Sequence, residues 1–88
     1  MWTIVSIRPN AANFTMGITY DDGEVILADF RPLMNKSEVM TALRDSVMFG
    51  TARIGARGRS IVWEGKAEFC ADALRLKFGH QTGQGNNR

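Results

Sequence analysis

The segment ITYDDGEVILADF, residues 18–30, sets the fold, because it places two strand-like runs on either side of one tight bend. The run before the bend alternates between apolar and small or polar side chains, which is the period of a half-buried strand. Its apolar positions are Phe14, Met16, Ile18 and Tyr20. The run after the bend is apolar at five of the six positions from Val25 to Phe30. We therefore predict a β-hairpin whose second strand carries apolar side chains on both faces.

Two closures of the bend compete, and they differ in register. A two-residue Asp22-Gly23 loop is the commonest hairpin turn, but it would set Asp21 opposite Glu24, two like charges. A three-residue loop, with Gly23 left-handed, sets Tyr20 opposite Glu24 instead. Ile18 then faces Ile26, Met16 faces Ala28 and Phe14 faces Phe30. Because apolar cross-strand pairs contribute about 0.2–1 kcal/mol each, we predict the three-residue loop.

This register divides the second strand between two faces, since successive side chains of a strand point in opposite directions. Ile26, Ala28 and Phe30 point to the core, and Val25 and Leu27 point to the other face. The pair must be covered by the following helix, by the C-terminal segment or by a second subunit. Val25 and Leu27 are therefore our first candidate interaction surface.

The remaining chain supplies further short elements. Residues 3–8 form a strand that Pro9-Asn10 ends, and a helix begins near Asn35 or Ser37 and stops at Gly50. The apolar stripe of that helix comprises Val39, Met40, Leu43 and Val47. Residues 51–54 and 60–63 form two more strands around a turn at 55–58. Residues 71–78 fit a helix or a strand equally well. We predict one α+β domain over residues 1–78, with a small antiparallel sheet of about five short strands and one or two short helices, and a disordered tail over 79–88.

Length and composition limit the class of protein. The chain has 88 residues, enough for one domain. No apolar run approaches the roughly 18–20 residues that span a bilayer, and the N-terminus does not resemble a signal peptide. A single cysteine, Cys70, rules out an internal disulfide and fits a reducing compartment. We predict a cytoplasmic protein that does not bind membranes.

The charge is unevenly distributed along the chain. Residues 1–43 carry three basic and five acidic side chains, whereas residues 44–88 carry eight basic and four acidic ones. Arg53, Arg57 and Arg59 surround the turn at 55–58 and could contact phosphates. We favour a solvated hairpin tip as the explanation of this cluster, because a dedicated nucleic-acid protein usually has a denser basic patch.

Several short motifs follow one another along the chain. They are D-G-E at 22–24, D-F-x-P-L at 29–33, L-x-D at 43–45, Phe49, Ile54, I-x-W at 61–63 and A-E-F-C-A-D-A-L at 67–74. Their order and spacing resemble the domain-of-unknown-function family 2442 from about Val5 to Leu76. One departure is the turn after Trp63, where the family usually has W-x-x-G and this chain has W-E-G-K.

The resemblance implies an α+β fold and no established activity. Members of the family are similar to proteins that lie beside a small toxin-like partner or are fused to a helix-turn-helix domain. By association alone, that implies an accessory or regulatory role of the toxin-antitoxin kind. This chain has no room for the fused DNA-binding domain.

No constellation of side chains predicts catalysis, a cofactor or a metal. Cys70 needs a nearby base to act as a nucleophile, and the single histidine, His80, lies in the predicted tail. Cys70 is expected to be a small, partly buried residue. The acidic bend lacks the ligand series of a calcium loop. Glu64, Glu68 and Asp72 would align on a helix, but Gly65 argues against a continuous one.

We therefore expect a non-enzymatic interaction module that binds an unidentified protein partner or itself. The alternative is a nucleic-acid-binding accessory protein that uses Arg53, Arg57 and Arg59. We expect no cofactor in either case.

Overall fold

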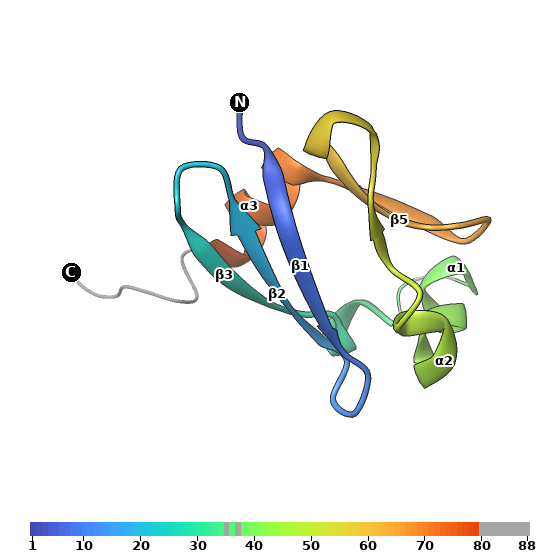
Figure 1. The fold of residues 1–88 in the computed structure, drawn as a ribbon. Coiled ribbons are helices and arrows are strands. Elements are labelled where there is room, and N and C mark those ends of the chain that lie inside the picture. The colour runs from blue at the N-terminus through green and yellow to red at the C-terminus, as the bar shows by residue number, and fades with distance from the viewer. Residues whose placement is uncertain (35, 37, 80–88) are drawn as a thin grey trace.

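The protein folds into two small antiparallel sheets and several short helices, so the predicted α+β class is confirmed. The structure, a computed structural model, describes residues 1–34, 36 and 38–79 (Figure 1). The first sheet has the strand order β1-β2-β3 and the second β4-β5-β6, so the prediction of one sheet with about five strands was too simple. The strands are β1 (Ile4–Asn10), β2 (Thr15–Tyr20), β3 (Val25–Asp29), β4 (Arg53–Ile54), β5 (Ser60–Trp63) and β6 (Ala67–Cys70). The helices are η1 (Arg31–Leu33), α1 (Glu38–Thr41), η2 (Ala42–Arg44), α2 (Ser46–Phe49), η3 (Ala56–Gly58) and α3 (Ala71–Phe78), where η denotes a 3₁₀ turn.

The β2–β3 hairpin closes with the predicted three-residue loop. The Tyr20 N–H donates to the Glu24 carbonyl at 2.9 Å, and the Gly23 N–H donates to the Tyr20 carbonyl at 3.0 Å. Gly23 has a φ of 89°, a conformation that glycine adopts without steric cost. Ile18 pairs with Ile26 and Met16 with Ala28, as the sequence predicts.

Strand β1 is longer than predicted, because it continues through Pro9 and Asn10. Pro9 pairs with Met16, and Asn10 pairs with Thr15. Proline is tolerated here because β1 is an edge strand of its sheet and needs hydrogen bonds on one side only.

The single helix predicted between residues 37 and 50 is wrong, because the chain breaks at Asp45. This residue is extended, with φ −76° and ψ 117°, and its carboxylate accepts the N–H of Val47 at 2.9 Å and of Met48 at 3.5 Å. Capping of α2 therefore replaces a continuous helix. The break also changes the buried stripe, since Val47 is 77% exposed while Phe49 is buried.

The C-terminal third contains one strand that the sequence did not reveal. Strand β6 pairs with β5, and the residues after it form the helix α3, which decides between the two predicted alternatives for 71–78.

The turn at 55–58 forms as predicted and packs against β1. A Cβ on Gly58 would lie 2.5 Å from the Ile4 carbonyl oxygen, so only glycine fits there. Gly79 caps α3, and the rest of the predicted disordered tail lies outside the described residues.

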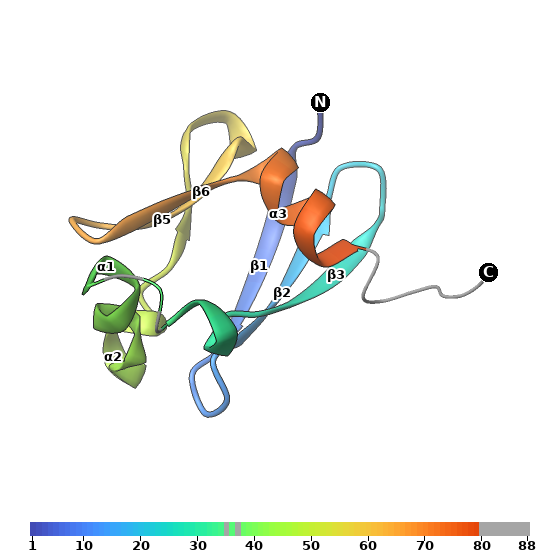
Figure 2. The same cartoon turned by 180° about the vertical axis from the view of Figure 1, so that it is seen from behind.

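Helix α3 covers one face of the β1-β2-β3 sheet, as Figure 2 shows from behind. An aromatic cluster centred on Phe30, which is fully buried, joins this layer to α2 and to the second sheet. The Phe30 ring lies 5.4–5.7 Å from four other rings, those of Phe49, Trp63, Phe69 and Phe78. The Trp63 indole N–H also donates to the Phe49 carbonyl at 2.9 Å, which satisfies its buried polar atom.

We predict that Phe30→Ala lowers the free energy of unfolding by roughly 3–5 kcal/mol, because it leaves a cavity among four rings. Leu76→Ala is the control, since Leu76 is 64% exposed and its truncation should change stability by less than about 0.5 kcal/mol. Urea unfolding followed by circular dichroism measures both. Equal effects of the two substitutions would contradict the central place given to Phe30.

Candidate interaction surface

The outer edge of β3 carries backbone groups that have no partner among the described residues. The carbonyl of Glu24 and the N–H of Phe30 both bond toward β2, at 2.9 Å to the Tyr20 N–H and 3.0 Å to the Phe14 carbonyl. Since backbone polar groups alternate in direction along a strand, those of Val25, Leu27 and Asp29 point away from β2. No described strand lies beyond β3, so this edge is open for a further strand.

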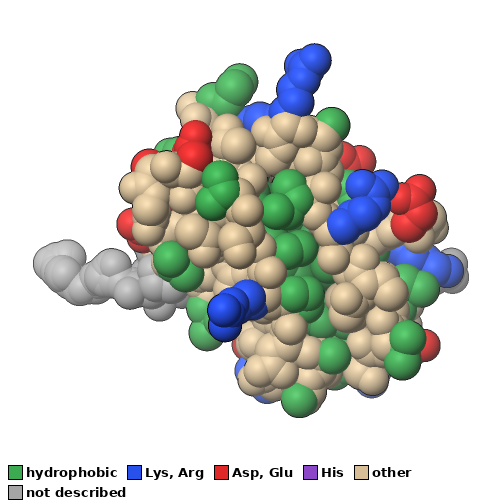
Figure 3. Space-filling view, in the orientation of Figure 1, with side chains coloured by type: hydrophobic (Ala, Val, Ile, Leu, Met, Phe, Trp, Pro, Cys, Tyr) green, Lys and Arg blue, Asp and Glu red, His purple; other side chains and the backbone are tan. Residues whose placement is uncertain are grey.

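The side chains of the same strand add an apolar surface to this edge. Val25 and Leu27 are each 55% exposed, whereas Ile26 and Ala28 between and beyond them are buried. The predicted division of the strand between two faces is therefore confirmed. Helix α3 lies behind the sheet in Figure 1, and Figure 3 looks onto the opposite face, where hydrophobic side chains are visible over the region of β3. Their neighbours on β2, Gly17 and Thr19, are too small to cover them.

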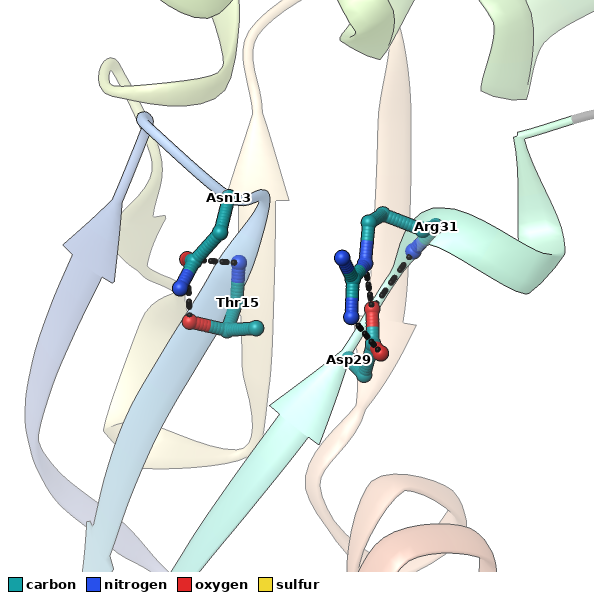
Figure 4. Close-up of polar contacts among 4 residues, drawn as sticks. All are labelled: Asn13, Thr15, Asp29 and Arg31. Carbon is teal, nitrogen blue, oxygen red and sulfur yellow. Dashed lines mark hydrogen bonds and ion pairs between the residues drawn. The ribbon is translucent and has the colours of Figure 1, made fainter.

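Charges of opposite sign flank β3 at its two ends. The turn before it contains Asp21, Asp22 and Glu24, and Arg31 follows it. Arg31 pairs with Asp29 through two hydrogen bonds, Nε to Oδ1 at 3.0 Å and Nη2 to Oδ2 at 2.7 Å (Figure 4). These bonds lower the pKa of Asp29 and raise that of Arg31.

The three arginines singled out in the sequence differ in their surroundings. Arg53 pairs with Glu64 at 2.5 Å, and Arg59 pairs with Asp72 at 3.1 Å. Only Arg57 of the three is exposed without an ion pair to the described residues. Two of the three positive charges are therefore offset by carboxylates, which leaves little excess charge for a phosphate backbone.

Arg59 and Asp72 instead fasten the N-terminus to α3. The Asp72 carboxylate accepts the Trp2 N–H at 2.9 Å and both terminal nitrogens of Arg59, at 3.2 and 3.1 Å. Arg59 also donates to the Trp2 carbonyl. Sequence reasoning missed this contact, because Trp2 and Asp72 are 70 positions apart and no local pattern relates them.

A second long-range contact of this kind joins α3 to the hairpin turn. The Arg75 guanidinium lies over the rings of Trp2 and Tyr20, at 4.5 and 4.9 Å from their centroids, and pairs with Asp22 at 2.9 Å. The acidic bend is thus partly neutralised within the chain. The buried Tyr20 hydroxyl donates to the Ala71 carbonyl at 2.9 Å, and burial raises the pKa of Tyr20 to about 12.

The prediction of a partly buried Cys70 is wrong, because this residue is exposed. It is the last residue of β6 and the N-cap of α3, and its side chain, like that of Glu68 two positions earlier in the strand, is exposed. Cys70 lines an open pocket of about 530 Å³ together with Ala56, Arg59, Ser60 and Glu68. The described residues contain no group of three or more histidine, cysteine, aspartate or glutamate side chains arranged to hold a metal.

Comparison with known families agrees with the order of the sequence motifs. The pattern of the family described as "Protein of unknown function (DUF2442)" matches residues 4–79 of this chain. The chain belongs to the DUF2442 family. No curated protein and no solved structure matches it. Within the described part of this DUF2442 protein, no helix is long and apolar enough to cross a membrane.

We predict that this protein loses stability in acid, because Asp72 has a lowered pKa in the folded state. The hydrogen bond from Arg59 is the largest cause, followed by that from the Trp2 N–H. The free energy from this carboxylate is complete above its unfolded pKa of about 3.9 and is lost as the pH falls through the lower folded value. Asp72→Asn removes this contribution, so its stability depends less on pH in that range.

The control for this prediction is Glu68→Gln, which changes an exposed carboxylate without a hydrogen bond or ion pair to the described residues. Thermal unfolding between neutral and acidic pH measures both variants. An Asp72→Asn profile parallel to that of the unchanged protein would show that the contact does not stabilise the fold.

Proposed function

We propose that this DUF2442 protein is a non-enzymatic, cytoplasmic interaction module with an accessory or regulatory role, and that it binds protein through the edge of β3. The observation that carries the proposal is the coincidence of two features on one strand. Val25, Leu27 and Asp29 direct their backbone groups outward, and Val25 and Leu27 are each 55% exposed. Addition of a strand to such an edge uses the backbone for affinity and the side chains for specificity.

The partner that fits this edge best is a second copy of the chain. Two β3 strands related by a two-fold axis pair in antiparallel fashion, and each opposed pair then lies on the same face. With Ile26 on the axis, Val25 of each copy lies opposite Leu27 of the other. This register buries the two exposed apolar side chains against each other, and such pairs contribute about 0.2–1 kcal/mol each.

The charges at the ends of β3 favour the same antiparallel arrangement. With Ile26 on the axis, the end of β3 that Arg31 follows lies beside the acidic turn of the other copy, which contains Asp21. Asp29 lies opposite Gly23, which has no side chain to obstruct the approach. A parallel arrangement would place the two acidic turns together, which is unfavourable.

The C-terminal residues of the chain are a poorer match for this surface. Residues 80–88 read HQTGQGNNR and contain no apolar side chain. They therefore offer nothing that would remove Val25 and Leu27 from water.

We predict that Val25→Lys abolishes self-association, because it places a charge at the centre of the apolar contact. Val47→Lys is the matched control, since Val47 is also an exposed valine, 77% accessible, and lies on α2 away from β3. Sedimentation equilibrium over a wide range of protein concentrations measures the association of each variant. Circular dichroism establishes that both variants remain folded.

The proposal predicts a concentration-dependent dimer for the unchanged chain and for Val47→Lys, and a monomer for Val25→Lys. A monomer at every concentration, or a dimer that Val25→Lys leaves intact, would contradict it.

A further inference from the structure

A second feature of the molecule lies beyond the C-terminal end of β3, where an open pocket of about 350 Å³ is present. Four side chains line it: Phe14, Arg31, Met34 and Arg44. Two are apolar and two are cationic, and none is acidic. Such a combination of an apolar wall with a few polar groups is typical of sites for small ligands.

The apolar wall is held in a fixed position. Phe14 has a φ of 58°, which is rare for a bulky residue and costs energy that the surrounding structure must supply. Hydrogen bonds between the two neighbouring residues offset part of this cost. The Asn13 side-chain oxygen accepts the Thr15 N–H at 3.3 Å and the Thr15 hydroxyl at 2.7 Å (Figure 4). The Phe14 ring also packs edge-on against Phe49, with centroids 5.5 Å apart.

One of the two cations is oriented by a carboxylate. Asp29 accepts hydrogen bonds from Nε and Nη2 of Arg31 and also from its backbone N–H, at 3.0 Å. The third guanidinium nitrogen, Nη1, makes no bond to the other residues drawn in Figure 4. Arg31 is thus held in place with one nitrogen still able to donate to a ligand.

The other cation has no ion pair with a described residue. Arg44 is exposed, and the carboxylate next to it in the chain, that of Asp45, is turned toward the N–H groups of Val47 and Met48. Two guanidinium groups and the single carboxylate of Asp29 leave one net positive charge at the pocket. That charge matches a monoanion better than a phosphate dianion.

We propose that this pocket binds a carboxylate carried on a small apolar group. The carboxylate accepts from Arg44 and from Nη1 of Arg31, and the apolar group lies against Phe14 and Met34. Charge-assisted bonds from guanidinium to carboxylate are among the stronger hydrogen bonds in proteins. The site shares Arg31 with the proposed β3 dimer, whereas Arg44 has no part in that dimer, so substitution of Arg44 tests the pocket separately.

The test is a titration of the ¹⁵N-labelled chain with 3-phenylpropionate, followed by NMR. We expect saturable shifts of the backbone signals of Phe14, Met34 and Arg44. Arg44→Gln should weaken binding about tenfold or more, since it replaces a charged donor to the carboxylate with a shorter, neutral one. Arg57→Gln is the matched control, because it removes another exposed arginine without an ion pair and should leave binding unchanged. The spectra themselves show whether each variant is folded.

Two further arms define the chemistry of the ligand. The neutral analogue 3-phenylpropanamide should not bind, because it lacks the charge. N-acetyl-glycyl-phenylalanine carries the same carboxylate at a peptide C-terminus, and its amide is the neutral counterpart. Tighter binding of the peptide acid than of 3-phenylpropionate assigns the site to a protein C-terminus, and the reverse assigns it to a free organic acid. Absence of saturable shifts with either acid, or equal binding by Arg44→Gln and the unchanged chain, would overturn the proposal.

Discussion

Phe30 lies where the β2–β3 hairpin, the second sheet and α3 meet, and its ring contacts bring these elements together. Its ring is 5.7 Å from Phe49 and Phe78 and 5.4 Å from Trp63, so residues from α2, α3 and β5 surround one side chain. In a chain of 88 residues the core is small, and each buried aromatic ring carries a large share of the apolar area removed from water. The inward direction of Phe30 is therefore a strong constraint on β3.

That constraint determines which side chains of β3 face solvent. Because a strand alternates, a register that buries Phe30, Ala28 and Ile26 must expose Leu27 and Val25. Helix α3 covers the inner face of the sheet, and no described element covers the outer face over these two residues. Val25 and Leu27 are therefore exposed because the core requires the alternate side chains of β3 to point inward. They lie on a strand edge that has no partner strand among the described residues, so a further strand can pair there.

The hairpin was predictable from sequence because its determinants are local. The like charges of Asp21 and Glu24, the glycine at 23 and the alternation of residues 14–20 all lie within one short segment. The helix between 37 and 50 was predicted less well, because the capping by Asp45 competes with an apolar stripe that continues across it. Strand β6 is only four residues long, and its pairing with β5 rather than its own pattern defines it.

The polar contacts between distant segments were outside the reach of sequence reasoning. Arg75 forms an ion pair with Asp22 and lies over Trp2, and Arg59 forms one with Asp72, yet each of these side chains alone looks like an ordinary surface charge. The tertiary fold brings them together. The pocket at Arg31 and Arg44 is of the same kind, because Phe14 reaches it only through the left-handed turn before β2.

Amide hydrogen exchange along β3, measured at low and high protein concentration, tests most directly whether this strand is the interacting edge. The amides of Ile26 and Ala28 bond to β2 and should be protected at both concentrations. The amides of Val25 and Leu27 point outward, so they should exchange rapidly when the chain is dilute and slowly when it associates. Exchange of Val25 and Leu27 at the same rate at every concentration would contradict the assignment of β3 as the interacting edge.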